Sequence, residues 1–149
     1  MVLGHSNQVT STATIAVNSW NHVAVSRASG SVKVFVNGIG TSGSSITTDL
    51  NDTTRIPTFG KYTHSTQLAY KGYISNLRVV NGTAVYTSDF TPPTSELTAI
   101  PNTVLLCCQN SEDPTQEETG KTITAYGKFA DSDFVKLQPK VNNLLGLIV

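Results

Sequence analysis

Hydrophobic and polar residues alternate with a period of two through several short stretches of this chain, which is the pattern of strands with one face on a core. The alternation is clearest from Tyr73 to Val80, where we expect Asn76 and Arg78 to stay in solvent. Asn81-Gly82 then supplies a turn, and Asp89 to Pro93 ends the segment with residues that do not continue a central strand. A strand, a turn and a polar exit in one stretch predict the corner of a β-sandwich.

A hairpin is predicted earlier in the chain. Trp20 to Arg27 and Val32 to Val36 both alternate, with a turn between them. Asn37-Gly38 is a strong hairpin signal, so Ile39 to Ser45 should return antiparallel to the second of these strands. The side chains expected to face the core are all valines, namely Val23, Val25, Val32, Val34 and Val36.

The remaining strands are predicted to be short, and no helix longer than two turns is expected. Ser111 to Gly120 carries four acids and a proline and should be an exposed loop. Thr103 to Gln109 is almost continuously apolar, which favours a strand covered on both faces. The other predicted strands are Thr12 to Val17, Ile56 to Lys61, Lys121 to Tyr126 and Lys128 to Val135. The fold class predicted from this pattern is all-β.

Length and charge narrow the possible roles. The 149 residues suit one domain, which we place at residues 12–137, between an N-terminal segment at 1–11 and an apolar tail at 138–149. Ten basic residues balance ten acidic ones, and no basic run is present. Binding to nucleic acid, which needs clustered positive charge, is therefore not expected.

Neither a leader nor a membrane span is expected. Met1 to Thr10 has no basic start and no apolar stretch of the kind that forms a signal peptide. The longest apolar run, Leu144 to Val149, is far shorter than the ~20 residues of a membrane-spanning helix, so we expect no membrane insertion. Cys107 and Cys108 should point to opposite faces of a strand, so we expect no disulfide between them and interpret them as small buried residues.

Five segments, in order, carry a resemblance to a known family: WNHVAVSR, SGSVKVFVNG, YKGYISNLRVVNGTAVYTSDFTPP, NTVLLCCQ and KTITAYGKF. They resemble the later strands of the concanavalin A-like lectin/glucanase superfamily. More narrowly, they are similar to laminin-G-like domains in structural proteins of tailed bacteriophages, especially marine ones. The resemblance covers roughly Thr12 to Val135 and implies a jelly-roll β-sandwich of two antiparallel sheets. By itself it implies no chemistry.

The start of the chain departs from this family. Only Met1 to Val17 precedes the Trp20 segment, whereas the family carries several further strands there. An incomplete sandwich would leave open edges, so we expect a neighbouring chain or a segment of a longer protein to complete it. The apolar tail suggests the same, and the residues predicted to make assembly contacts are Leu144, Leu145, Leu147 and Ile148.

The acidic residues also depart from the family. Its glucanases place two carboxylates on one strand, about 5 Å apart, and no such strand is found in this sequence. Asp131 and Asp133 flank a serine, while four acids share the predicted loop, namely Glu112, Asp113, Glu117 and Glu118. His5, His22 and His64 are scattered without a nucleophile motif, and His22 is interpreted as a strand residue satisfied by a neighbour. No enzymatic activity is expected.

Two kinds of binding site are left as candidates. Aromatic rings stack on sugar rings while amides and carboxylates bind the hydroxyls, and the residues of this kind are Asn51, Asp52, Tyr62, His64 and Tyr70. The alternative for them is ordinary loop polarity. Laminin-G-like domains often bind calcium through Asp and Asn oxygens, here Asp49, Asn51 and Asp52, and the alternative is a simple turn. No other cofactor is predicted.

The leading hypothesis is a non-enzymatic structural module of a virion, either decorating a capsid or forming part of a tail appendage. Its partners would be copies of itself and other virion proteins, together with host-surface polysaccharide. It would be assembled in the host cytoplasm and exposed on the particle. The alternative is a carbohydrate-binding domain of a secreted or surface adhesin.

Overall fold

The computed structural model of the protein describes residues 9–47, 57–60, 70, 72–125 and 147–148. These residues contain strands, turns and extended segments, and there is no helix among them that could cross a membrane. The six strands are β1 (Val23–Ala28), β2 (Ser31–Val36), β3 (Ile39–Ser45), β4 (Leu77–Val80), β5 (Thr103–Cys107) and β6 (Leu147–Ile148).

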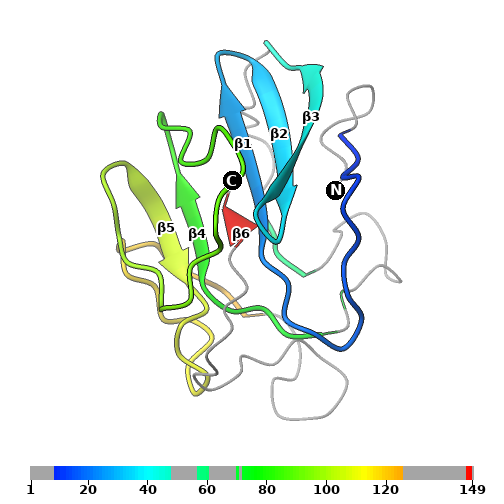
Figure 1. Cartoon of the computed structure of the whole chain (residues 1–149). Coiled ribbons are helices and arrows are strands. Elements are labelled where there is room, and N and C mark those ends of the chain that lie inside the picture. Colours follow the sequence, from blue (N-terminus) through cyan, green and yellow to red (C-terminus); the bar gives the residue numbers. More distant parts are fainter. Residues whose placement is uncertain (1–8, 48–56, 61–69, 71, 126–146, 149) are drawn as a thin grey trace.

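The strands form two antiparallel sheets that a short parallel strand joins edge to edge into one six-stranded, hydrogen-bonded sheet. β1, β2 and β3 pair antiparallel in sequence order, and β4 pairs antiparallel with β5. β6 lies between β1 and β4 and is parallel to both, which gives the strand order β3-β2-β1-β6-β4-β5 (Figure 1). The all-β fold class with two antiparallel sheets is therefore confirmed.

The two predicted hairpin turns are present, and their backbones explain their residues. Asn37 and Gly38 both have positive φ, 51° and 84°, as a tight turn between twisted antiparallel strands requires. Ser29 and Gly30 repeat this pattern at the turn between β1 and β2, with φ of 48° and 84°. Asparagine and glycine tolerate this left-handed region better than other residues, so these turns set the register of β1, β2 and β3.

One face of the β1–β3 sheet carries the core predicted from the alternating valines. Val25, Val32 and Val34 are buried there together with Val9 and Ile46. Val36 is also buried, while Val23 is half-buried. Val9 lies directly over Gly43 in β3, in the space that a β-carbon at this glycine would occupy. The predicted inward set is thus confirmed, and the segment before β1 helps to cover it.

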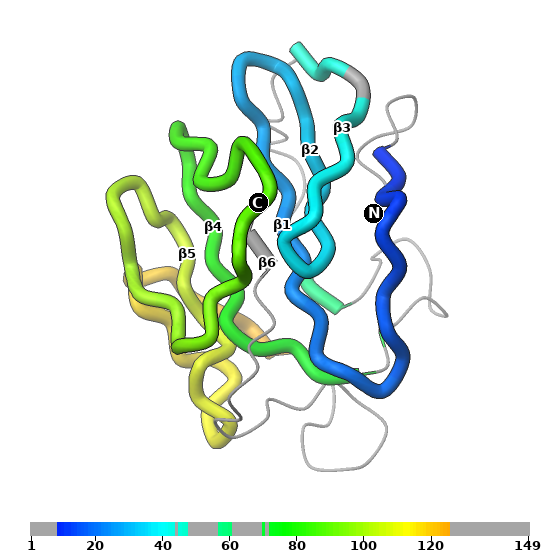
Figure 2. The backbone as a smooth tube through the Cα atoms, viewed as in Figure 1, coloured from blue at the N-terminus to red at the C-terminus, as the bar shows by residue number. Residues whose placement is uncertain are grey.

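The opposite face of the same sheet is buried as well, which the alternation does not predict. Ala24 and Phe35 are paired across β1 and β2, and both are completely buried. The segment after β4 covers them with three half-buried side chains, Val85, Tyr86 and Phe90. Figure 2 shows this segment in green, crossing between β4 and β1 in that view. Burial on both faces makes β1 and β2 the centre of the molecule.

β4 is shorter than predicted, and the polar residues expected in solvent are buried. Asn76 has a positive φ of 56°, which interrupts the strand before Leu77. Asn76 and Arg78 are only 2% and 6% exposed. Each is held by backbone groups of the segment before β5, because Asn76 Oδ1 accepts the Leu97 N–H at 3.0 Å and Arg78 donates to the Thr98 carbonyl at 2.9 Å. The prediction that these two residues stay in solvent was wrong.

The predicted strand from Thr12 to Val17 is also wrong. Val17 is 84% exposed, and no strand forms in this segment. The reason lies in the side chain of Asn21, which accepts the N–H of Ala16 at 3.1 Å and donates to its carbonyl at 2.8 Å. This side chain satisfies the backbone groups that a neighbouring strand would have used.

The later predictions are confirmed in part. β5 ends at Cys107, and Val104 near its start is exposed, so only the end of this strand is covered on both faces. Residues 57–60 and 121–125 form no strand, and residues 111–120 form the predicted loop. Ile56, Lys61 and the predicted strand from Lys128 to Val135 lie outside the described residues.

Candidate functional site

Three large aromatic side chains are unusually exposed and come from neighbouring segments. Phe59, Tyr70 and Tyr73 are 40%, 50% and 42% exposed. Trp20 is partly exposed and contacts Tyr73, with ring centroids 6.3 Å apart and planes tilted by 44°. We call these four residues the aromatic patch. Exposed aromatic rings offer an apolar surface of the kind that sugar rings and apolar ligands use.

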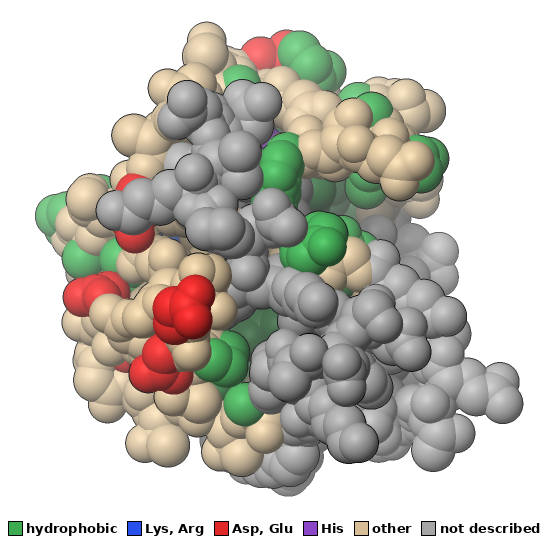
Figure 3. Space-filling view, turned by 90° about the horizontal axis from the view of Figure 1, so that it is seen from below, with side chains coloured by type: hydrophobic (Ala, Val, Ile, Leu, Met, Phe, Trp, Pro, Cys, Tyr) green, Lys and Arg blue, Asp and Glu red, His purple; other side chains and the backbone are tan. Residues whose placement is uncertain are grey.

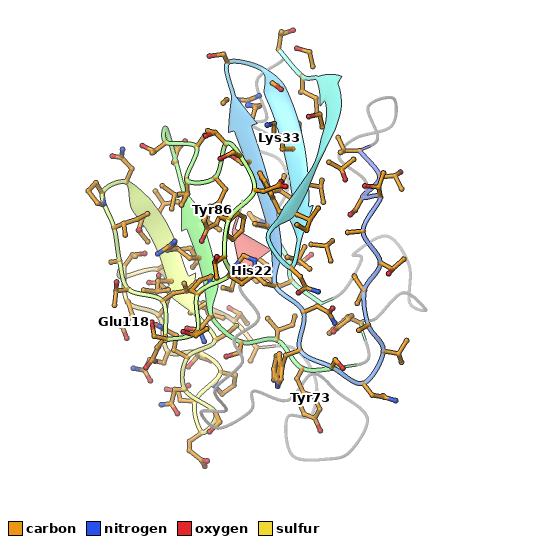
Figure 4. All side chains as sticks on the ribbon, in the orientation of Figure 1. His22, Lys33, Tyr73, Tyr86 and Glu118 are labelled. Carbon is orange, nitrogen blue, oxygen red and sulfur yellow. The ribbon has the colours of Figure 1, made fainter. Side chains whose placement is uncertain are left out.

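Backbone contacts bring the parts of the aromatic patch together. The Tyr70 N–H donates to the Gly60 carbonyl at 2.7 Å, which links Tyr70 to the segment that carries Phe59. The ring of Tyr70 lies over Gly72, where a β-carbon would come within 2.8 Å of its hydroxyl oxygen. Gly72 therefore lets the Tyr70 ring lie close to the backbone next to Tyr73. In Figure 4, Tyr73 lies at the lower end of the molecule, apart from His22 and Tyr86.

Of the residues predicted to bind sugar, the structure describes Tyr70. Asn51, Asp52, Tyr62 and His64 lie outside the described residues, as does Asp49 of the predicted calcium site. No group of three or more metal-binding side chains occurs in the part of the chain that the structure describes. The calcium site and the other sugar contacts stay predictions.

Sequence reasoning misses the other members of the aromatic patch. It treats Tyr73 only as one position of an alternating strand, and Trp20 as the start of another. Strand periodicity was used to place the side chains of Tyr73 and Trp20, but neither residue lies in one of the six strands. The spacing of Tyr70 and Tyr73 on either side of a glycine is the signal in the sequence that could have found them.

A second aromatic cluster surrounds the buried side chain of His22. The His22 ring meets the edges of Phe90 and Tyr86, with centroids 5.3 and 6.1 Å away, while Tyr86 and Phe90 stack on each other at 3.5 Å. Neither ring nitrogen of His22 has a hydrogen-bond partner among the described residues. Burial and the nearby charge of Arg78 lower the pKa of His22 to about 4. His22 was predicted to be a strand side chain satisfied by a neighbour, but it lies one residue before β1, and aromatic rings take the place of a hydrogen-bond partner among the described residues.

The acidic loop is organised around Glu117, whose carboxylate accepts four hydrogen bonds. Oε1 accepts from the Leu106 N–H at 2.9 Å and the Thr119 hydroxyl at 2.6 Å, and Oε2 accepts from the N–H groups of Thr119 and Lys121 at 2.8 and 2.7 Å. Burial alone would raise the pKa of Glu117, but these hydrogen bonds outweigh it and lower that pKa. Glu117 thus ties the loop to β5.

The other acids of the loop lie at the surface. Glu112, Asp113 and Glu118 are exposed, and Asp113 accepts hydrogen bonds within its own turn from the N–H and hydroxyl of Thr115. Figure 3 shows acidic side chains gathered on the left of the molecule, the side on which Glu118 lies in Figure 4. Asp131 and Asp133 lie outside the described residues.

The two cysteines are closer than a strand would place them. Cys107 is the last residue of β5 and is buried, as predicted, but Cys108 lies beyond the strand with a positive φ of 62°. This turn brings the two sulfur atoms to 3.7 Å. The prediction that these side chains point to opposite faces was therefore wrong.

The described strands define an all-β domain. The family profile described as the concanavalin A-like lectin/glucanases superfamily matches residues 2–85, which is more than half of the chain. The chain belongs to this superfamily, as the sequence resemblance predicted. The match runs through β1, β2, β3 and β4. No curated protein and no solved structure matches the chain.

Proposed function

We propose that this protein is a non-enzymatic carbohydrate-recognition module whose sugar-contacting surface is the aromatic patch. The observation that carries the proposal is that Phe59, Tyr70 and Tyr73 are each at least 40% exposed, with the Trp20 ring in contact with Tyr73 and the Tyr70 backbone bonded to Gly60 next to Phe59. The C–H faces of a pyranose ring stack on such rings, and the tyrosine hydroxyls offer hydrogen bonds to sugar hydroxyls. Membership of a superfamily that includes lectins supports the same function.

The hydrogen bonding of Glu117 supports recognition over hydrolysis. Glycoside hydrolysis needs two carboxyl groups that flank the scissile bond, one of which gives up a proton. The carboxylate of Glu117 is already occupied by four hydrogen bonds. Soluble β-glucans should therefore remain intact on prolonged incubation with the protein, and release of reducing sugar that an acid-to-amide substitution abolishes would contradict this part of the proposal.

The binding proposal is tested by screening the full chain on arrays of bacterial, plant and animal glycans. Binding to a retained glycan should weaken about tenfold or more in Tyr73→Ala and in Tyr70→Ala, since each removes one stacking ring. Val104→Thr, which changes an exposed apolar residue on β5, serves as the control and should bind as the wild type does. The proposal fails if no glycan binds, or if both tyrosine variants bind unchanged.

We further propose that this module works as a structural component of a bacteriophage particle, on the capsid or on a tail appendage. The support is the similarity of the segment from Lys71 to Pro93 to laminin-G-like domains of such proteins, together with the low share of charged residues. Antibody against the chain should label purified virus particles. Labelling confined to host cells or medium would favour the alternative, a domain of a secreted or surface adhesin.

Assembly through the C-terminal tail is part of this second proposal. The backbone of Leu147 and Ile148 pairs with β1 and β4 of the same chain, while Leu144 and Leu145 lie outside the described residues. The variant Leu144→Asp with Leu147→Asp is expected to sediment as a smaller species than the wild type. Because β6 also joins the two sheets, urea unfolding of the same variant must show that the chain stays folded. An unchanged mass would contradict the predicted tail contact.

A further inference from the structure

Cys107 and Cys108 form a pair of thiols at the end of β5, next to the start of β4. Their sulfur atoms lie 3.7 Å apart, and the two residues are the only cysteines in the sequence. Cys107 is buried, whereas Cys108 is partly exposed. Neither thiol has a place in the proposed recognition of sugars, which uses the aromatic patch.

The backbone at Cys108 is what brings the sulfurs together. Consecutive strand residues point to opposite faces, but Cys108 adopts a φ of 62°, in the left-handed region that few residues other than glycine and asparagine visit. Its carbonyl accepts the N–H of Asn76 at 3.0 Å and the hydroxyl of Ser75 at 3.4 Å. Hydrogen bonds from the neighbouring chain segment therefore hold a conformation that costs energy by itself, and uncommon backbone of this kind is concentrated at functional sites.

The two thiols differ in acidity as well as in exposure. The hydrogen bond between them, together with burial, raises the pKa of Cys107, and the same hydrogen bond lowers the pKa of Cys108. Cys108 is thus both the more accessible thiol and the one that more readily becomes a thiolate, the reactive form in thiol–disulfide exchange.

We propose that Cys107 and Cys108 are a redox site that reacts with low-molecular-weight disulfides and closes reversibly to a vicinal disulfide. In the first step the Cys108 thiolate attacks one sulfur of the reagent disulfide. The sulfur–sulfur bond of the reagent breaks, a mixed disulfide forms on Cys108, and one reagent thiolate leaves and takes up the proton that Cys108 released.

In the second step Cys107 completes the exchange. Once Cys108 is a mixed disulfide, its negative charge no longer holds the proton on Cys107, so the Cys107 thiol ionises more easily. Its sulfur attacks the sulfur of Cys108, the mixed disulfide breaks, and the second reagent thiol leaves with the proton from Cys107. Two protein thiols are oxidised by two electrons, and one reagent disulfide is reduced to two thiols.

The geometry also indicates that the bridge is easily reopened. Neighbouring α-carbons are about 3.8 Å apart across a trans peptide bond, below the usual range of about 4.4–6.8 Å for disulfide-bonded residues. A bridge between adjacent cysteines is therefore strained, and strained disulfides are the more readily reduced ones. The site should follow the redox conditions around the protein and should not act as a permanent structural bridge.

The test is to incubate the reduced full chain with excess oxidised glutathione and to measure its intact mass after acid quenching. The wild type should lose the mass of two hydrogen atoms, retain no glutathione and show no free thiol after denaturation. Dithiothreitol should restore both thiols. Since the chain has no other cysteine, each change reports on this pair.

Single variants test the assigned order of attack. Cys107→Ser should stop at the mixed disulfide and gain one glutathione. Cys108→Ser should react at about one tenth of that rate or more slowly still, because its remaining thiol is buried. Cys107→Ala is the second variant if the serine lowers stability in urea. A wild type that stays reduced, keeps glutathione or forms a covalent dimer would overturn the proposal. Equal reaction rates of the two single variants would overturn the order of attack.

Discussion

The backbones of Gly38 and Phe90 meet directly, although one residue lies in the turn between β2 and β3 and the other follows β4. The Phe90 N–H donates to the Gly38 carbonyl at 3.0 Å. The Phe90 carbonyl occupies the space that a β-carbon at Gly38 would need, and the ring of Pro92 lies beside it. This contact fixes the segment that covers Phe35 and His22, so the burial of the second face of β1 and β2 depends on a glycine at this turn.

Gly38→Ala should therefore lower the free energy of unfolding by about 3 kcal/mol or more, because it combines a positive φ with a backbone clash. Gly82→Ala is the matched control, since Gly82 has nearly the same φ, 83°, and a β-carbon added there would meet no atom within 4 Å. It should cost about 1–2 kcal/mol, the backbone effect alone. Urea unfolding measures both. Equal losses would show that the contact with Phe90 contributes nothing.

Asn76 offers a second case in which backbone and side-chain effects can be separated. Its side chain accepts the Leu97 N–H and donates to the Ser75 hydroxyl, and its φ is 56°. Asn76→Ala should cost about 2–4 kcal/mol, because it loses the hydrogen bonds and strains the backbone. Asn76→Gly loses the same hydrogen bonds but accepts the positive φ, so it should be about 1 kcal/mol more stable than the alanine variant. The reverse order in urea unfolding would contradict this account.

The parts of the fold that could be predicted from the sequence are those that local rules decide. The turns at Ser29-Gly30 and Asn37-Gly38 and the valines between them set the register of β1, β2 and β3, and all of these were predicted. Period-two alternation says which residues share a face, but it does not say whether the other face is also covered. The burial of Phe35 under Tyr86 and Phe90 depends on contacts between distant segments, so the sequence could not show it.

Other errors have a related cause, since a single side chain can bind backbone groups that a partner strand would otherwise bind. Asn21 satisfies the backbone of Ala16, so the predicted strand from Thr12 to Val17 does not form, and Asn76 is buried because it accepts the Leu97 N–H. The positive φ at Cys108 likewise could not be predicted, because cysteine has no special preference for it. The loop position of Tyr70 predicts a ligand contact, whereas alternation assigns Trp20 and Tyr73 to strands.

Glu117 should stabilise the loop after β5 chiefly at neutral pH. Glu117→Ala removes the acceptor for the N–H groups of Leu106, Thr119 and Lys121 and should cost about 1–2 kcal/mol at pH 7. The folded state lowers the pKa of Glu117 below its ordinary value of 4.5. The contribution of Glu117 to the free energy of unfolding is therefore present above pH 4.5 and is lost as the pH falls through the pKa of the folded state. Urea unfolding at several pH values measures the difference between wild type and variant.

The exposed Glu112 provides the control for this loop. Glu112→Ala changes a carboxylate of the same loop that makes a long contact, 3.5 Å, with the Ser111 hydroxyl. Its unfolding free energy should stay within about 0.5 kcal/mol of the wild type. If the two variants are equally destabilised, the hydrogen bonds to Glu117 do not account for the stability of the loop.

His22 should make the fold sensitive to mild acid. The folded protein keeps His22 neutral until about pH 4, because its pKa is lowered to that value, whereas the unfolded chain takes up the proton near the ordinary value of 6.5. Between these values the unfolded state binds more protons, so stability rises with pH in this window and falls as the pH drops from 6.5 towards 4. Below about pH 4 both states are protonated at this residue, and the loss should level off.

His22→Phe tests this directly, because it keeps an aromatic ring against Tyr86 and Phe90 and removes the titrating group. At pH 7 the variant should be about as stable as the wild type, since neither His22 nitrogen has a hydrogen-bond partner among the described residues that could be lost. As the pH falls from 6.5 to 4, the wild type should lose stability faster, so the difference in urea midpoint should grow in favour of the variant. The acidic residues titrate in both proteins and cancel in that difference. If the urea midpoints of the two proteins change with pH in parallel, His22 takes up its proton in the folded state as readily as in the unfolded one. The surrounding aromatic rings then do not exclude the charge.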